Sequence, residues 1–95
     1  MQEQLEDFMD EIGIPSNLIG YQYWIDAMCI AKVMDNGTYK VYMERIYKTI
    51  ANKYHASRNN VERCLRTARD KSNIKVKGNQ LFLAELLKLY NRRYK

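Results

Sequence analysis

Residues 43–71 read MERIYKTIANKYHASRNNVERCLRTARDK, and this stretch decides the fold. Its apolar residues recur every three or four positions on both sides of His55-Ala56-Ser57, which predicts one helix from about Val41 to Tyr54 and a second from Arg58 to about Lys71. Ser57 is a favourable N-cap for the second helix. Because two helices joined by so short a turn must cross at a steep angle, we expect a helix-turn-helix at about residues 43–71.

The same spacing assigns an inward face to each of these two helices. In the first helix the inward positions are Val41, Ile46, Ile50, Ala51 and Tyr54, flanked by Tyr42, Met43 and Tyr47. In the second helix they are Val61, Cys64, Leu65 and Ala68. The other positions of the second helix are mostly polar or charged, so this helix should turn a hydrophilic face outward.

Two helices are expected before this pair. An amphipathic helix from Gln2 to Ile12 should end at Gly13, which accepts the left-handed conformation of a helix C-terminus, two residues before Pro15. A helix from about Gly20 to Met34 is apolar on most of its circumference, so we expect it to be the central and most buried element.

A last helix is expected after the pair, from Gln80 to about Arg92, with Asn79 as its N-cap. The alternation of residues 74–83 around Gly78-Asn79 leaves a small β-hairpin as the alternative for that region. With the helix preferred, the sequence predicts an all-α fold, a bundle of five to six helices.

Size and composition restrict the class of protein. The 95 residues, 46% of them hydrophobic, suit one compact domain over residues 1–95. No apolar run is long enough to span a membrane and the acidic N-terminus does not resemble a signal peptide, so we expect a cytoplasmic location. Two cysteines and one histidine, Cys29, Cys64 and His55, are too scattered for a disulfide framework or a metal site.

The sequence also lacks the constellations that are typical of enzymes. It has no pair of carboxylates in an apolar setting and no glycine loop that could cradle a phosphate. His55 lies in the turn without a nearby serine-acid pair, and the N-cap role accounts for Ser57. We therefore expect a protein that acts by binding, with no catalytic residue, metal or cofactor.

Charge is distributed very unevenly along the chain. Residues 1–39 contain one base and seven acids, a net charge of −6, whereas residues 40–95 contain fifteen bases and four acids, a net charge of +11. A basic half of this kind attracts the phosphate backbone of nucleic acid, and an acidic half is turned away from it. The domain should therefore be dipolar, with the helix-turn-helix in its basic half.

The outward side chains of the second helix of the pair suit the major groove of DNA. Arginine can bind guanine through two donors, asparagine can pair with adenine, and a carboxylate can accept from cytosine. The predicted base-reading residues are Asn59, Asn60, Glu62, Arg63 and Arg66. The predicted phosphate contacts around them are Lys48, Lys53, Ser57, Arg58, Thr67, Arg69, Lys71 and Lys75, with Lys77 nearby. The alternative for this face is an ordinary solvated helix with Glu62 and Arg66 as an ion pair.

Several segments resemble a known family. They are Glu11-Ile-Gly-Ile-Pro15, Gly20-Tyr-x-Tyr23, Ile46-Tyr-x-x-Ile-Ala-x-Lys-Tyr54, Val61-Glu-Arg-x-x-Arg66 and Asn79-Gln-x-Phe-Leu-Ala84. In this order they resemble the C-terminal effector domain of the stage-zero sporulation master regulator, a bacterial response regulator. The resemblance implies a six-helix fold that reads short DNA boxes similar to TGTCGAA, often through tandem copies, and regulates transcription.

Carried over by position, the resemblance assigns base and backbone contacts to Glu62, Arg63 and Arg66, while Asn60 replaces a residue that is usually basic. It also implies an N-terminal phosphoacceptor receiver, for which these 95 residues have no room. The segment from Lys71 to Lys77 is much shorter than the family's, which has an extra helix there that is associated with RNA polymerase. Repression or competition for sites is therefore more credible than activation through that surface.

The expected partner is double-stranded DNA, bound by a monomer, a homodimer or a tandem pair. RNA polymerase or a related regulator is a further candidate partner. The chief alternative is a protein-interaction adaptor or inhibitor that binds a full-length regulator in place of DNA. RNA binding by the basic half is a weaker option, because the sequence has no recognisable motif for stacking single-stranded bases.

Overall fold

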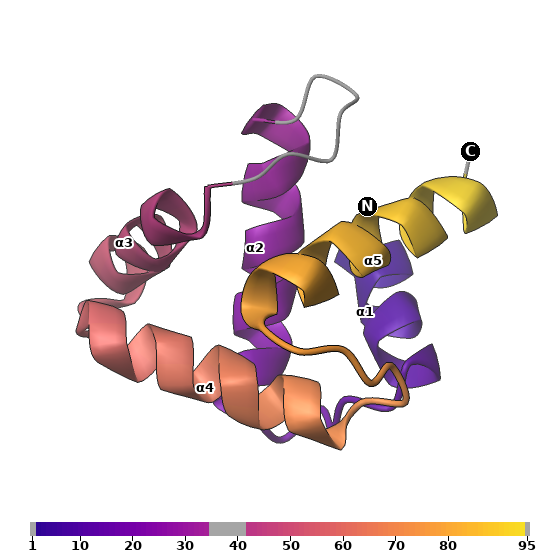
Figure 1. Ribbon diagram of the computed structural model, residues 1–95, viewed down its shortest axis with the longest axis horizontal. Coiled ribbons are helices and arrows are strands. Elements are labelled where there is room, and N and C mark those ends of the chain that lie inside the picture. The colour runs from indigo at the N-terminus through magenta and orange to yellow at the C-terminus, as the bar shows by residue number, and fades with distance from the viewer. Residues whose placement is uncertain (1, 35–41, 95) are drawn as a thin grey trace.

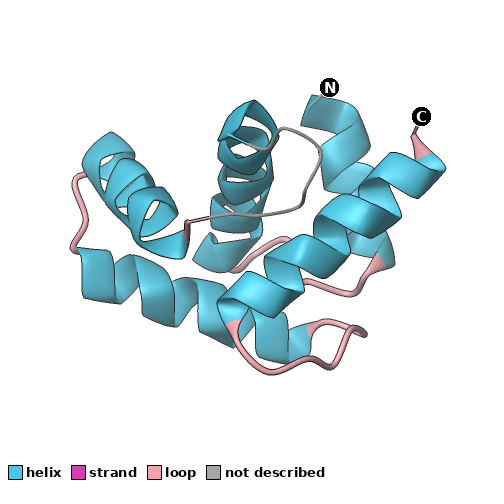
Figure 2. Ribbon diagram, turned by 45° about the horizontal axis from the view of Figure 1, so that its top comes forward, coloured by secondary structure: helices cyan, strands magenta, loops and turns pink. Residues whose placement is uncertain are grey.

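The structure, a computed structural model, describes residues 2–34 and 42–94. Five α-helices follow one another along these residues: α1 (Gln2–Glu11), α2 (Ile19–Met34), α3 (Met43–Tyr54), α4 (Arg58–Lys71) and α5 (Asn79–Arg93). The two ranges contain no strand, so the predicted all-α class is confirmed. Helix α2 lies in the middle, with α3 on one side of it and α1 and α5 on the other (Figures 1 and 2). No helix in these ranges is long and apolar enough to cross a membrane.

Helix α2 is central because its sequence is apolar almost all round. The side chains of Trp24, Ile25, Ala27, Met28 and Ala31 are all 0% exposed. The helix packs against each of the other four, in agreement with the central position that the sequence predicted. The Trp24 ring meets the Phe82 ring of α5 edge-on at 4.8 Å between centroids, and its indole N–H donates to the carbonyl of Leu65 in α4 at 2.8 Å. One side chain therefore joins α2 to both α4 and α5.

Helices α2 and α4 cross very closely at Gly20. A Cβ atom at this position would lie 2.4 Å from the carbonyl oxygen of Cys64 and 2.6 Å from the Cβ of Ala68. Both distances are far inside van der Waals contact, so a residue without a Cβ is required here. The backbone of α2 thus lies directly on α4.

The segment between α1 and α2 is tied to the segment that follows α4. Gly13 has a φ of +87°, and it ends α1 in the left-handed conformation that the sequence predicted. Close by, the backbone N–H of Asn73 donates to the carbonyl of Ile12 at 2.6 Å. The far end of α4 is therefore held against the end of α1.

Two tyrosines of α3 differ from the prediction in their burial. Tyr47, predicted to flank the core, is 6% exposed, whereas Tyr54, predicted to point inward, is 37% exposed. The Tyr54 ring packs against Tyr23, and its hydroxyl donates to the carboxylate of Asp26. This polar partner at the edge of the core keeps Tyr54 at the surface. Val41, also predicted to point inward, lies outside the described residues.

The start of α5 corrects the sequence prediction in one respect. The hairpin alternative is wrong, because residues 74–78 form a loop and residues 79–83 are helical. However, the N-cap residue is Gly78, with a φ of 90°, and not Asn79. The Asn79 side chain instead points into the protein, where it bonds to Arg69 and Tyr47. The side chain that was expected to cap the helix therefore forms tertiary hydrogen bonds.

Candidate nucleic-acid interface

The turn between α3 and α4 is built from two local features. His55 adopts the left-handed conformation at the end of α3, with a φ of 55°, and the N–H of Ala56 donates to the carbonyl of Ala51 at 2.9 Å. Ser57 then has extended backbone, and its Oγ accepts from the N–H of Asn60 at 3.1 Å. This confirms Ser57 as the N-cap of α4. The two helices follow each other as closely as a helix-turn-helix requires.

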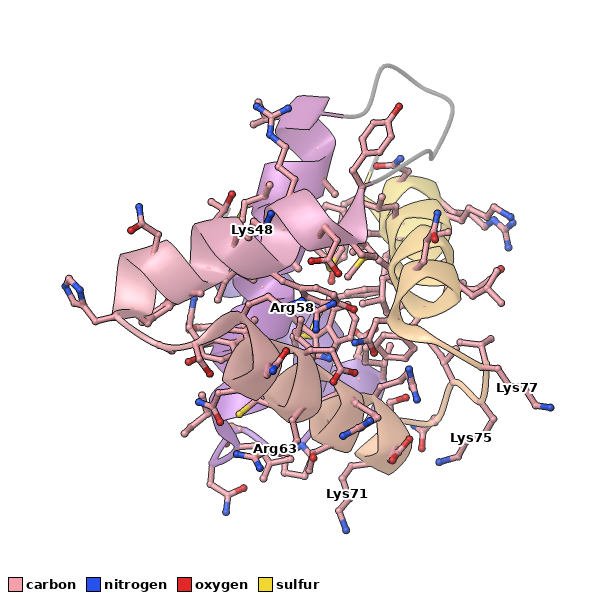
Figure 3. All side chains as sticks on the ribbon, turned by 60° about the vertical axis from the view of Figure 1, so that its left-hand side comes forward. Lys48, Arg58, Arg63, Lys71, Lys75 and Lys77 are labelled. Atoms are coloured by element: carbon pink, nitrogen blue, oxygen red, sulfur yellow. The ribbon has the colours of Figure 1, made fainter. Side chains whose placement is uncertain are left out.

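Helix α4 buries one face and exposes the opposite one. Val61, Leu65 and Ala68 are 0% exposed and pack on the core, as predicted, while Cys64 is half-buried at the edge of this face. Positions 59, 63, 66 and 70 lie on the other side of the helix, and all four residues are exposed. Arg63 projects from this face in Figure 3. The structure thus offers an exposed polar helix surface to a ligand.

Four of the five predicted base-reading residues form two pairs on α4. The Arg63 guanidinium donates to the Oδ1 of Asn60 at 2.9 Å. Glu62 and Arg66 form an i, i+4 ion pair at 3.9 Å, and the Arg66 side chain is still 50% exposed. Asn59 is exposed, and its Oδ1 accepts from Arg58 at 3.1 Å. Local pairing therefore orients these groups and leaves the arginines exposed.

The two arginines among the predicted phosphate contacts have partners within the protein. Arg58 forms a bidentate ion pair with Glu44 of α3, and its guanidinium lies 4.7 Å from the centroid of the Tyr47 ring. The hydrogen bond between them lowers the pKa of Glu44 and raises the pKa of Arg58. The Arg69 side chain is only 14% exposed and donates to the Oδ1 of Asn79 at 2.8 Å. Both arginines join α4 to other helices.

Lys53 is also paired within the protein. Its ammonium lies 3.1 Å from the carboxylate of Asp26, a buried residue of α2 that also accepts from Gln22 and Tyr54. The hydrogen bond to Asp26 raises the pKa of Lys53. The Lys53 side chain remains 58% exposed. The pair links the end of α3 to α2.

The remaining predicted phosphate contacts surround α4. Figure 3 shows Lys48 on α3, Lys71 at the end of α4, and Lys75 and Lys77 in the loop that follows. All four lysines are exposed, and the Lys75 ammonium donates to the carbonyl of Asp70 at 3.0 Å. Thr67 is exposed and borders a hollow between α4 and the start of α2.

Sequence reasoning missed four polar residues, three on α3 and one on α4. Arg45, Thr49 and Asn52 line a shallow groove on α3 together with Lys48. Their spacing places them on one helix face, so the periodicity that located the core could have located them as well. Asp70 was also missed, although it lies on the outward face of α4 and its side chain is 67% exposed.

An all-α fold with a short, serine-capped turn before an exposed polar helix is a helix-turn-helix domain. The chain belongs to the family described as sporulation initiation factor Spo0A C terminal, whose family model matches residues 5–93. This confirms the resemblance drawn from the sequence motifs. The family is the DNA-binding domain of a sporulation transcription factor. Neither a curated protein nor a solved structure matches the chain.

Proposed function

We propose that this chain binds double-stranded DNA in a sequence-specific way and regulates transcription, with α4 as the recognition helix. The observation that carries the proposal is the exposed face of α4, where Arg63 and Arg66 project beside carboxamide and carboxylate groups. An α-helix fits the major groove of B-DNA, and the first residues of a recognition helix approach the base edges most closely. The family membership supports the same function.

Each side chain near the start of α4 has a role in this proposal. Arg63 donates two hydrogen bonds to a guanine, and Glu62 accepts from the amino group of a cytosine. Asn59 and Arg66 assist at neighbouring positions. Asn60 is a second carboxamide at the base edges, and its Oδ1 also orients the Arg63 guanidinium. The pairing between Asn60 and Arg63 reduces the conformational freedom that Arg63 loses when it binds a base.

The phosphate backbone is held by the exposed donors around α4. Lys48, Lys71 and Lys75 supply positive charge, and the Ser57 hydroxyl keeps its own proton for a phosphate oxygen while it accepts from Asn60. Arg45 and Asn52 extend this set along α3, the helix that crosses the backbone in a helix-turn-helix complex. Arg58, Arg69 and Lys53 contribute mainly by joining their helices to the rest of the protein, because each already has a partner within the protein.

Selection of bound duplexes from a random pool tests the proposal directly. We expect one short box to be enriched, because base contacts discriminate by about 1 to 3 kcal/mol for each well-read base pair. Spacing between repeated boxes would identify a homodimer or a tandem pair. If no sequence is enriched at moderate salt, DNA reading is wrong, and a protein-interaction adaptor becomes the better explanation.

The variant Arg63→Ala should weaken binding to the enriched duplex by about 1 to 3 kcal/mol and relax specificity at one base pair. The loss should be much smaller on a scrambled duplex, where Arg63 has no guanine to bind. Fluorescence anisotropy with both duplexes measures the difference. Arg92→Ala on α5 is the matched control, because it removes the same charge outside the helix-turn-helix. An equal loss on both duplexes for Arg63→Ala would contradict the base-reading role.

The variant Lys48→Ala should weaken binding to all duplexes by a similar factor. A phosphate contact carries no sequence information, and its loss should reduce the slope of log affinity against log salt concentration by about one. Binding titrations at several salt concentrations measure this slope. The matched control is Lys32→Ala on α2, whose ammonium lies over the Tyr90 ring of α5 at 4.6 Å. A slope that falls equally in both variants would argue against a local contact at Lys48.

A further inference from the structure

A chain of polar side chains inside the protein connects three helices. The Tyr47 hydroxyl of α3 accepts from the Nδ2 of Asn79 at 3.1 Å, and the Oδ1 of Asn79 accepts from Arg69 of α4 at 2.8 Å. Tyr47 and Asn79 are each 6% exposed, and the hydrogen bond between them is buried. Asn79 is the first residue of α5, so the last turn of α4 reaches α3 through a single carboxamide.

The chemistry of the three groups fixes the direction of every bond in this chain. A guanidinium can only donate, so the carboxamide oxygen of Asn79 must face Arg69. The amide nitrogen then faces Tyr47, whose oxygen must accept. A buried group that loses such a partner keeps the full cost of its desolvation, so each member holds its neighbours in place.

Tyr47 also holds the other end of α4. The guanidinium of Arg58, the first residue of α4, lies 4.7 Å from the centroid of the Tyr47 ring. The same guanidinium is paired with Glu44, which lies one turn before Tyr47 on α3. Both ends of α4 are therefore anchored to one residue of α3, at the first residue directly and in the last turn through Asn79.

We infer that Asn79 and Tyr47 are positioning residues that set the angle of α4 in the major groove, and through it the sequence specificity. The inference rests on the proposed function. Tyr47 belongs to α3 and Asn79 to α5, and both side chains are buried. They therefore act on DNA only through α4, the helix that they hold in place. Directional base contacts tolerate only fractions of an ångström of displacement, whereas phosphate attraction does not depend on such precision.

The main test is Asn79→Leu, which keeps the approximate size of the side chain and removes both hydrogen bonds. We expect affinity for the duplex enriched from the random pool to fall about tenfold, which is the effect of about one lost base contact. Affinity for a scrambled duplex of the same length should stay within about twofold, with an unchanged salt slope, because Arg69 keeps its charge. Anisotropy titrations with the two duplexes give this ratio.

Two conservative variants separate positioning from simple stability. In Asn79→Asp the carboxylate accepts from Arg69 and also from the Tyr47 hydroxyl, which can turn its proton toward it. This variant should retain the specificity ratio within about twofold. Tyr47→Phe keeps the ring under Arg58 and removes only the hydroxyl, so its specificity ratio should fall but less than in Asn79→Leu. Leu81→Ala, at a 59% exposed position of the same turn, is the matched control.

The outcomes distinguish this inference from the proposed function. If Arg63→Ala leaves the specificity ratio unchanged, DNA reading by α4 is wrong. If Arg63→Ala lowers the ratio but Asn79→Leu and Tyr47→Phe do not, only the positioning role is overturned. The positioning role is also overturned if Asn79→Leu and Tyr47→Phe weaken binding to the enriched and the scrambled duplex equally. Circular dichroism confirms that each variant is folded at the assay temperature, and if Asn79→Leu does not fold, Tyr47→Phe alone decides.

Discussion

Replacing Trp24 with alanine is expected to lower the free energy of unfolding by about 3 to 5 kcal/mol. The indole is 0% exposed and joins three helices, through its edge-on contact with Phe82 and its hydrogen bond to the carbonyl of Leu65. Alanine would leave a cavity at the centre of the core that the surrounding helices cannot fill completely. For a domain whose total stability is about 5 to 15 kcal/mol, this is a large share.

Urea unfolding followed by circular dichroism at 222 nm measures this loss, because the variant has no tryptophan fluorescence. Trp24→Phe should recover part of the stability, since it keeps a ring that can pack against Phe82, whereas the indole hydrogen bond and part of the ring volume are lost. Tyr42→Ala serves as the control for removing an aromatic ring at a position that is 64% exposed. A similar loss in Trp24→Ala and Tyr42→Ala would mean that the core is not centred on Trp24.

Replacing Gly20 with alanine is expected to destabilise the protein by about 1 to 3 kcal/mol or more, although alanine is the better helix former. The added Cβ would meet the carbonyl oxygen of Cys64 at 2.4 Å, so the backbones of α2 and α4 must move apart. Because α4 is displaced, we also expect the specificity ratio between enriched and scrambled duplexes to fall. Urea unfolding and anisotropy titrations measure the two effects.

A second substitution identifies the atom responsible. In the double variant Gly20→Ala with Ala68→Gly, the side-chain clash with Ala68 is removed but the clash with the Cys64 carbonyl remains. The double variant should therefore be no more stable than Gly20→Ala alone. Full recovery of stability would show that the side chain, and not the backbone, sets the distance between the helices. Val33→Ala in α2, at an 88% exposed position, is the control for substitution in that helix.

Most of the fold could be predicted because its signals are local. The apolar spacing of α4, the Ser57 cap and the glycine at the end of α1 each depend on a few consecutive residues. The central position of α2 followed from an apolar circumference that can only be covered by other helices. The exposed face of α4 followed from the same spacing, since the residues opposite a buried stripe point outward.

The remaining features depend on pairs of residues far apart in the chain. Asn79 has the side chain of a good N-cap. Only the structure shows that its carboxamide oxygen accepts from Arg69 and its amide nitrogen donates to Tyr47. Lys53 is of a residue type that commonly contacts phosphate, and only the structure shows its partner Asp26 on α2. In the sequence, Gly20 is only a residue that disfavours a helix. Its role is to let the backbone of α4 approach, and spacing along the sequence does not reveal that contact.

The contact of two backbones at Gly20 has a mechanical consequence. Most helix pairs are separated by a layer of side chains that can change rotamer and absorb a small shift. At this crossing no such layer exists, so a change of side-chain rotamer cannot absorb a displacement of α2 toward α4. A shift of the α2 backbone at Gly20 would therefore press directly on the α4 backbone at Cys64.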